Sequence, residues 1–230
     1  MEYMATSVKQ PTIGIEGSKT RFQVRRIYCV GRNYRAHAIE MGADPDREVP
    51  FFFMKPADAI VQNGSTIPYP KQTTNLHYEI ELVVAIGKSG ESISEENALE
   101  YVWGYGVGID LTRRDLQNQA KKAGRPWDMG KGFDNSAPCT NLKPVDEVGH
   151  PDTGAGEIWI KVNGEIKQRS TLDLHIWNVA ETISYLSGLC TLESGDLIFM
   201  GTPEGVGPVV PGDTMEGHID GLENLIIKIA

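Results

Sequence analysis

Cysteine is scarce in this chain, and no two cysteines are paired by spacing. The 230 residues contain three, Cys29, Cys139 and Cys190, which are widely separated and form no Cys-x-x-Cys motif. That pattern excludes a cysteine metal clip, a redox pair and a disulfide framework. Reduced core thiols in a cytosolic protein are the interpretation that remains.

Long apolar runs and an excess of positive charge are also lacking. No stretch approaches the roughly 20 apolar residues of a membrane span, and the first residues, which include Lys9 and Glu16, hold no signal-peptide core. We therefore expect no membrane contact and a cytoplasmic location. The formal net charge of −9 excludes a general nucleic-acid surface. We interpret the one basic cluster, Lys121, Lys122 and Arg125, as a solvated helix end.

The length and composition suit one soluble domain with a sizeable core. Residues up to about Lys19 show no sustained periodicity, so we expect a tail or loosely packed extension at 1–24 and one folded domain at 25–230. Strand patterns occur before, between and after the helix patterns, without regular βαβ alternation. The prediction is a β-rich α+β fold.

Two acidic residues interrupt an alternating stretch, His77 to Val84, that predicts a β-strand. Side chains two apart on a strand share a face, so Glu79 and Glu81 would stand side by side. Like charges so placed repel, and an unpaired buried carboxylate is costly to desolvate. A cation should therefore neutralise them, unless both simply line the solvent face of an edge strand.

A third carboxylate, Asp110, ends a second apolar run from Val102 to Ile109. Glu79, Glu81 and Asp110 make an all-oxygen ligand set, which suits hard cations better than zinc or copper. We predict a divalent metal site for Mg²⁺ or Mn²⁺, with Ca²⁺ as a further candidate. After Asp110 the chain should enter a helix with Thr112 as its N-cap.

Two helical pairs carry candidate functional groups. On a short helix predicted from Tyr34 to Met41, His37 and Glu40 are three residues apart and share a face. A histidine beside a carboxylate has the parts of a general base with its orienting partner, although a surface ion pair is the alternative. Arg114 and Gln117 form the second pair.

The polar segment 43–50 predicts a loop, which we expect to close over substrate.

Four motifs occur in order, and together they resemble the fumarylacetoacetate hydrolase family. They are His-x-Glu-x-Glu at 77–81, Asp-x-x-x-Arg-Asp-x-Gln at 110–117, Gly-Lys-x-Phe-Asp at 130–134 and Gly-Thr-Pro-Glu-Gly-Val-Gly at 201–207. The resemblance covers nearly everything from about Arg25 to Ala230. Within the family the chain is most similar to small acylpyruvate hydrolases, as the segments 30–34, 50–53 and 125–127 indicate.

The resemblance implies a fold, a partner and a division of labour in the site. The fold would be a rolled mixed β structure with a few short helices, usually a homodimer. The metal would bind the carboxylate and oxo oxygens of an acylpyruvate, while His37 and Glu40 activate water and Lys131 faces the developing charge. The implied substrate-binding residues are Arg32, Arg114, Gln117, Gly201 and Thr202.

The reaction implied by the resemblance is hydrolysis of a carbon–carbon bond in an acylpyruvate, specifically fumarylpyruvate to fumarate and pyruvate, as in gentisate breakdown. Two other functions stay open. The same metal and lysine would suit an oxaloacetate decarboxylase or a related enolate-forming lyase or isomerase. A non-catalytic oxo-acid binding protein is the alternative from another class.

Overall fold

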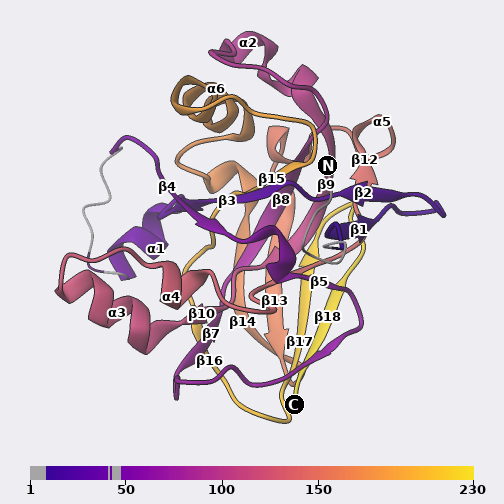
Figure 1. The fold of residues 1–230 in the computed structure, drawn as a ribbon. Coiled ribbons are helices and arrows are strands. Elements are labelled where there is room, and N and C mark those ends of the chain that lie inside the picture. Colours follow the sequence, from indigo (N-terminus) through magenta and orange to yellow (C-terminus); the bar gives the residue numbers. More distant parts are fainter. Residues whose placement is uncertain (1–8, 41, 43–47) are drawn as a thin grey trace, which may run out of the picture.

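A mixed eight-stranded sheet forms the centre of the molecule in a computed structural model, which describes residues 9–40, 42 and 48–230 (Figure 1). Its β3–β15 and β5–β11 pairs are parallel and the others are antiparallel. Across the sheet the strands are β4 (Phe51–Lys55), β3 (Arg26–Gly31), β15 (Asp196–Phe199), β8 (Ile80–Ile86), β9 (Val102–Ile109), β11 (Ala137–Cys139) and β5 (Ile60–Gln62), with β12 (Lys143–Pro144) beside β9.

Three smaller sheets complete the β structure of the described residues. The five-stranded sheet contains β14 (Glu165–Thr171), β13 (Glu157–Val162), β17 (Thr214–Ile219), β18 (Leu225–Ile229) and β6 (Thr66–Ile67). The three-stranded sheet contains β10 (Thr112–Arg113), β7 (Leu76–Tyr78) and β16 (Gly207–Val209), and the hairpin contains β1 (Thr12–Gly14) and β2 (Arg21–Gln23). This rolled, strand-rich arrangement with short helices is the fold class that the sequence predicted.

The helices are short and lie around the sheets (Figure 1). They are α1 (Arg35–Glu40), α2 (Glu95–Ala98), α3 (Arg114–Lys122), α4 (Asp128–Lys131), α5 (Val145–Val148) and α6 (Val179–Leu189). A capping box begins α6, with Asn178 and Glu181 exchanging side-chain to backbone bonds. Among the described residues, no helix has the length and apolar character needed to cross a membrane.

The central sheet is buried on both faces. Alternate residues of β8 point to different hydrophobic clusters: Leu82 and Val84 to one, Val83 and Ala85 to the other. The five-stranded sheet covers the first face, where Ile160 of β13 belongs to the same cluster as Leu82. Because both faces are dry, a polar side chain on this sheet must find a partner within the protein.

Glycines on alternate positions of β9 allow close packing on the second face. A Cβ added to Gly108 would lie 2.5 Å from atoms of Phe199 and of Val83. We expect Gly108→Ala to lower the free energy of unfolding by about 1–3 kcal/mol through overpacking. Gly188 is the matched control, because it lies inside α6, which continues to Leu189.

A Cβ on Gly188 would meet no atom within 4 Å, and its backbone is helical. Gly188→Ala should therefore raise the free energy of unfolding by about 0.5–1 kcal/mol. Urea unfolding of both variants checks the pair. A Gly108→Ala protein as stable as the parent would contradict the packing described for this face.

The hairpin β1–β2 covers the second face of the sheet. Ile13 and Phe22 face each other in register and are buried with Val24 in the second cluster. The Leu142 N–H also donates to the Gly14 carbonyl oxygen over 2.9 Å. The expectation of a tail or loosely packed extension is therefore wrong for the described part of this segment. Its two strands have only three residues each, which is too short for the sequence to show strand periodicity.

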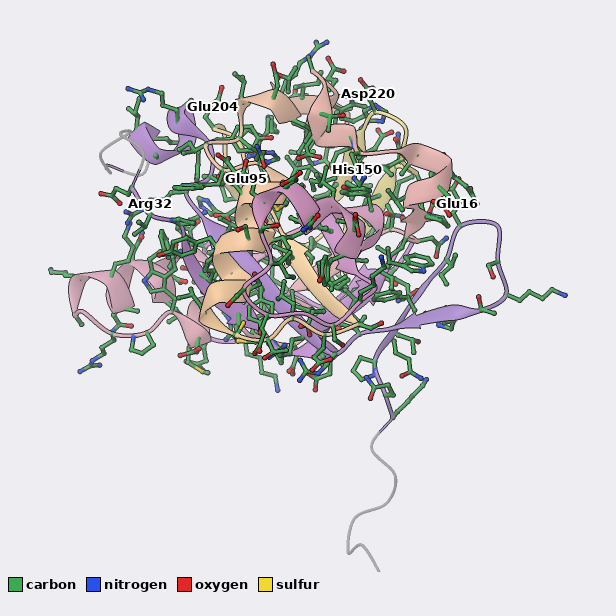
Figure 2. All side chains as sticks on the ribbon, turned by 90° about the horizontal axis from the view of Figure 1, so that it is seen from above. Glu16, Arg32, Glu95, His150, Glu204 and Asp220 are labelled. Carbon is green, nitrogen blue, oxygen red and sulfur yellow. The ribbon has the colours of Figure 1, made fainter. Side chains whose placement is uncertain are left out.

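The expected closing loop falls largely on residues 43–47, which lie outside the described residues. Seen from above in Figure 2, Arg32 and Glu204 lie on one side of the molecule and Glu16, next to the hairpin, lies on the other. The hairpin thus supports the sheet at a distance from Arg32, which is a residue of the pocket described next.

Candidate active site and metal centre

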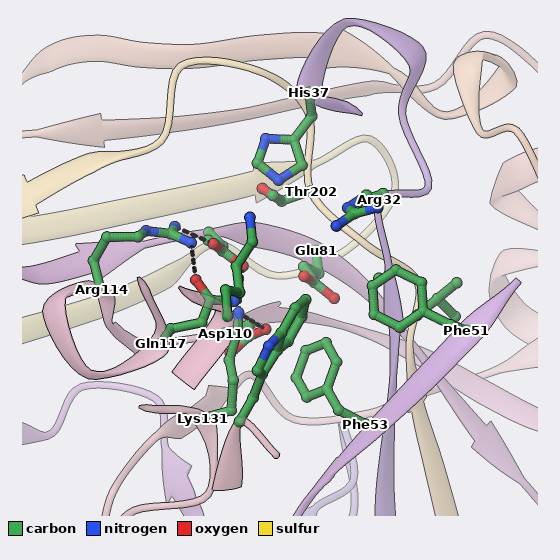
Figure 3. Close-up of a pocket in the computed structure, with 15 residues that line it drawn as sticks. Arg32, His37, Phe51, Phe53, Glu81, Asp110, Arg114, Gln117, Lys131 and Thr202 are labelled. Atoms are coloured by element: carbon green, nitrogen blue, oxygen red, sulfur yellow. Dashed lines mark hydrogen bonds and ion pairs between the residues drawn. The ribbon is translucent and has the colours of Figure 1, made fainter. Parts of the chain in front are cut away.

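A pocket opens where the ends of β3, β4, β8 and β9 meet helices α1, α3 and α4 (Figure 3). It is lined by Val30, Gly31, Arg32, His37, Phe51, Phe53, Glu79, Glu81, Asp110, Arg114, Gln117, Lys121, Trp127, Lys131 and Thr202. These residues come from segments far apart in the chain, so the pocket is a product of the tertiary fold.

The three predicted carboxylates meet in this pocket. One carboxylate oxygen from each of Glu79, Glu81 and Asp110 lies within 4.8 Å of the other two, and all three residues are buried. The Asp110 N–H donates to the Glu79 carbonyl oxygen over 2.8 Å, which brings the two residues together. The predicted single strand is divided, because β7 ends at Tyr78 and β8 begins at Ile80, yet Glu79 and Glu81 still line one pocket.

Two of the carboxylates are paired with cations. Glu79 bonds Arg114 and, over 2.7 Å, the ammonium of Lys131, while Asp110 lies 2.6 Å from Lys131 and 2.8 Å from Lys55. Burial by itself would raise the pKa of Glu79, but the charges of Lys131 and Arg114 outweigh it and hold the pKa well below its usual range. Glu79 is therefore ionised at neutral pH.

Glu81 has no cationic partner among the residues that the structure describes. Within the described ranges it accepts one hydrogen bond, from the Gly201 N–H over 2.8 Å. Burial, together with the neighbouring charges of Asp110 and Glu79, raises its pKa well above the usual value. A buried carboxylate beside two others, without a side-chain cation of its own, fits a divalent cation held by oxygen ligands.

Lys131 uses all of its hydrogen-bonding capacity within the protein. Its Nζ lies 2.7 Å from Glu79, 2.6 Å from Asp110 and 2.7 Å from the Thr112 hydroxyl, which accounts for its three N–H groups. Burial opposes its charge, but Asp110 and Glu79 raise the pKa of Lys131 above its ordinary value. Lys131 can therefore act on a ligand in the pocket through its positive charge. Its N–H groups are already bound within the protein.

Thr112 does not cap the helix that follows. It pairs with His77 across β10 and β7, and α3 begins two residues later at Arg114, without a side-chain cap. The hydroxyl instead serves Lys131. On α3 the Arg114 guanidinium donates to Gln117 over 2.6 Å, so the predicted sharing of one helical face is confirmed.

Lys55 is a further buried cation at the carboxylate triad. It is 1% exposed, and its Nζ lies between Asp110 and the carbonyl oxygens of Leu111 and Lys131. A signal for this position exists in the alternation of β4, since Phe51, Phe53 and Lys55 fall on the same face. Phe51 and Phe53 line the pocket, and Lys55 continues that face to Asp110.

The predicted pair on α1 is in contact. His37 Nδ1 lies 3.0 Å from Glu40 Oε2, and the other Glu40 oxygen accepts the Gly205 N–H over 3.1 Å. His37 is buried and lines the pocket above Thr202 (Figure 3). With Nδ1 directed at Glu40, Nε2 makes no hydrogen bond to any residue in the described part of the chain.

Gln168 orients Thr202, a role that the sequence reasoning missed. Its amide NH₂ donates to the Thr202 hydroxyl oxygen over 2.8 Å and to the Pro203 carbonyl over 2.7 Å, while its oxygen accepts the Ile80 N–H. Because Thr202 accepts from Gln168, its own proton is free to point into the pocket. A glutamine within the largely exposed strand β14 carries no signal of this role.

An aromatic wall closes the side of the pocket formed by β4. Trp127 lies 5.4 Å from Phe51 and 5.8 Å from Phe53, measured between ring centroids. The Lys131 ammonium lies 4.8 Å from the centre of the Phe53 ring. This wall keeps water from one side of the charged cluster, and electrostatic interactions are strengthened where water is excluded.

The family model of the fumarylacetoacetate (FAA) hydrolase C-terminal domain matches residues 26–230 of the chain. The chain belongs to this family. Structural similarity within the family extends over the whole chain. A crystal structure of fumarylpyruvate hydrolase from Pseudomonas aeruginosa, in complex with Mn²⁺ and pyruvate, is 55% identical with a TM-score of 0.96 and covers 100% of this chain and 99% of that chain.

Curated relatives in the family include more than one activity. A fumarylpyruvate hydrolase of Ralstonia sp is 44% identical over 191 residues, 82% of this chain and 98% of that protein. The mitochondrial oxaloacetate tautomerase of Homo sapiens is 42% identical over 205 residues, 89% of this chain and 91% of that protein. Family membership therefore does not by itself identify the reaction, which must be inferred from the residues of the site.

Four of the five residues to which the family resemblance assigned substrate binding lie at the pocket surface. Arg32, Arg114, Gln117 and Thr202 line the pocket of this fumarylacetoacetate hydrolase family member. Gly201 does not, since its N–H is directed at Glu81. A Cβ there would lie 2.7 Å from Asn33, and its φ of +91° favours glycine.

Proposed function

We propose that this protein hydrolyses a carbon–carbon bond in an acylpyruvate, converting fumarylpyruvate to fumarate and pyruvate with the help of Mg²⁺ or Mn²⁺. The observation that carries the proposal is one pocket lined by both the carboxylate triad and His37, which is held by Glu40. The relatives named fumarylpyruvate hydrolase, one of them in complex with Mn²⁺ and pyruvate, support the substrate class.

Glu79, Glu81 and Asp110 would hold the metal. All three are oxygen ligands, the preference of Mg²⁺ and Mn²⁺, and Glu81 lacks a competing cation in the described structure. The metal, when bound, supplies positive charge that polarises the carboxylate and oxo oxygens of an oxo acid.

His37 acts as the general base for water in this proposal. The Nδ1–H donates to Glu40, so the Nε2 lone pair faces the pocket and takes one proton from water as the oxygen attacks the acyl carbonyl carbon. Glu40 holds the tautomer and stabilises the imidazolium that forms. Its position is fixed in turn by the Gly205 N–H.

Bond cleavage places negative charge on the pyruvate half of the substrate. The electron pair of the broken carbon–carbon bond enters that half, which then takes a proton to become pyruvate. Lys131 stabilises this charge through its field, because its N–H groups are already bound. In this proposal Arg114, Gln117 and Thr202 orient substrate oxygens, and Arg32 binds the acyl end.

The second candidate is an enolate-forming reaction on oxaloacetate, which the oxaloacetate tautomerase relative favours. It needs the carboxylate triad and Lys131 but no hydrolytic water. The His37–Glu40 contact is what favours hydrolysis here. A non-catalytic oxo-acid binding protein has less support, because such a protein has no use for a base poised beside the triad.

We further propose a homodimer in the cytoplasm and a place in gentisate breakdown, following the family resemblance. Light scattering on the purified protein measures the mass in solution. A monomeric mass would contradict the dimer.

The experiment that tests the function is turnover of fumarylpyruvate by chelator-stripped protein, with and without added Mg²⁺ or Mn²⁺. We expect metal-dependent loss of substrate absorbance with release of pyruvate and fumarate in equal amounts. Release of both products at the same rate without metal would contradict the metal role. Turnover of oxaloacetate but not of fumarylpyruvate would select the second candidate instead.

A further inference from the structure

Lys121 is a pocket residue, although its sequence context suggests a solvated helix end. It lies in the last turn of α3 and lines the pocket together with Arg32 and Arg114, while the adjacent Lys122 is exposed. The interpretation as a solvated helix end is therefore wrong for Lys121. Consecutive residues of an α-helix are rotated by about 100° about the helix axis, so Lys122 lies in water while Lys121 faces the site.

The cations of the pocket divide into two sets. Lys131 and Arg114 are paired with the carboxylates of the triad. Arg32 and Lys121, in contrast, form no ion pair with any residue in the described ranges. Positive charge without a carboxylate partner is thus concentrated at one part of the pocket lining.

The surroundings of Lys121 are unfavourable to its charge, and Arg32 has an uncommon backbone conformation. Burial, and then the neighbouring charges of Arg32 and Arg114, lower the pKa of Lys121. The Arg32 backbone has a φ of +55°, a left-handed conformation that is uncommon for arginine. Its guanidinium lies 5.3 Å from the centre of the Phe51 ring, and Figure 3 shows it beside the pocket, across from Arg114.

Gathered like charges and a disfavoured backbone both cost free energy, and such features persist where a ligand needs them. An anionic group bound between Arg32 and Lys121 would remove the repulsion and form charge-assisted hydrogen bonds. The α-carboxylate of the oxo acid is needed at the metal triad, so a second anion must come from elsewhere on the substrate.

We propose that Lys121, together with Arg32, binds a carboxylate at the acyl end of the substrate and makes the enzyme select acylpyruvates that carry two carboxylates. This inference rests on the proposed function, because it assigns the second end of the same substrate. Lys121 is then a specificity-determining residue, and the aromatic wall of Phe51 and Trp127 borders the unsaturated chain between the two carboxylates.

The test compares fumarylpyruvate with acetylpyruvate, which has the same oxo-acid end but no second carboxylate. In Lys121→Met we expect kcat/KM for fumarylpyruvate to fall by about 10–100-fold, chiefly through KM, because one charged contact is lost. For acetylpyruvate the change should stay within about 3-fold, since that substrate never makes the contact. Lys121→Arg keeps the charge and should retain most of the preference.

Lys122→Met is the matched control, since it removes a charge one residue away on the exposed side of α3. It should leave both substrates unaffected. Equal losses on both substrates in Lys121→Met would overturn the proposal, because the lysine would then act on the common end. Unchanged kinetics on both would overturn it as well.

A binding measurement separates this proposal from the proposed function. Fumarate and crotonate share a carbon skeleton, but crotonate has a methyl group in place of the second carboxylate. Calorimetry on the Mn²⁺-loaded protein should show fumarate binding that weakens at least several-fold in Lys121→Met and a preference over crotonate that disappears. If the parent protein turns over neither acylpyruvate, the proposed function fails, and this measurement alone decides whether the dicarboxylate site exists.

Discussion

Glu81→Gln is expected to abolish metal-dependent turnover without destabilising the metal-free protein. The variant keeps the side-chain shape and an oxygen that accepts the Gly201 N–H, but removes one of three ligand charges. We expect kcat to fall by at least about 10³-fold, as when a charged group that organises an electrostatic site is lost. Calorimetric titration with Mn²⁺ should show a large loss of affinity.

The stability of the metal-free variant tests the electrostatic account. Because the folded-state pKa of Glu81 is raised, the carboxyl binds its proton more tightly in the native protein, and ionising it costs stability as pH rises through that pKa. Removing the ionisable group removes this cost. At neutral and higher pH, the free energy of unfolding of metal-free Glu81→Gln should equal or exceed that of the metal-free parent protein.

Glu79→Gln is the matched control, with the opposite effect on stability. It also removes a triad carboxylate, but it leaves Arg114 without its buried carboxylate and Lys131 with Asp110 as its remaining one. Breaking such a pair typically costs about 3–5 kcal/mol. Thermal unfolding of both metal-free variants compares them directly. Equal destabilisation of the two variants would contradict the claim that Glu81 is the one triad carboxylate without a cationic partner among the described residues.

His37→Asn should lower kcat for fumarylpyruvate hydrolysis by about 10²–10⁴-fold, the usual contribution of a general base. The asparagine is small enough to fit and cannot take up a proton. Binding of pyruvate to the Mn²⁺-loaded variant should remain within about 2-fold of the parent, because the oxo-acid end lies at the triad and His37 acts on water. Stopped assays of pyruvate release and calorimetry measure the two quantities.

Glu40→Gln provides the graded control for the base. Its amide oxygen can still accept from His37 Nδ1, so the tautomer is held, but the negative charge that stabilises the imidazolium is lost. A smaller fall of about 10-fold is expected. Oxaloacetate decarboxylation, if the protein has this activity, should survive in both variants because it needs no hydrolytic water. Full hydrolysis by His37→Asn would show that another group activates the water.

The chemistry of the metal centre could be predicted before the fold was known. Glu79 and Glu81 are two residues apart in a stretch with strand periodicity, and Asp110 follows a run of strand residues, so local periodicity predicted a place and a direction for each carboxylate. The same is true of His37 and Glu40, which one helical turn brings to 3.0 Å. That these groups share one pocket rested on the family resemblance, since spacing says nothing about distant segments.

The partners of those groups could not be predicted in this way. Lys55, Lys131 and Gln168 reach Asp110, Glu79 and Thr202 across separations of many residues in the chain. A lysine has the same sequence signature whether its ammonium is in water or buried against a carboxylate. Thr112 was misjudged for the same reason, because a hydroxyl after a strand suits a helix cap as well as it suits Lys131.

Short-range geometry depends on φ, ψ and the period of a single element, so the amino-acid sequence by itself established the two functional pairs, the hard oxygen ligands and the β-rich class. Long-range geometry depends on how the sheets pack. Only the tertiary structure decided that Glu81 has no cationic partner among the described residues, that the three N–H groups of Lys131 are all bound, and that Lys121 rather than Lys122 faces the pocket. Each of these outcomes is set by burial, which costs ionised groups their hydration and makes the identity of every neighbour count.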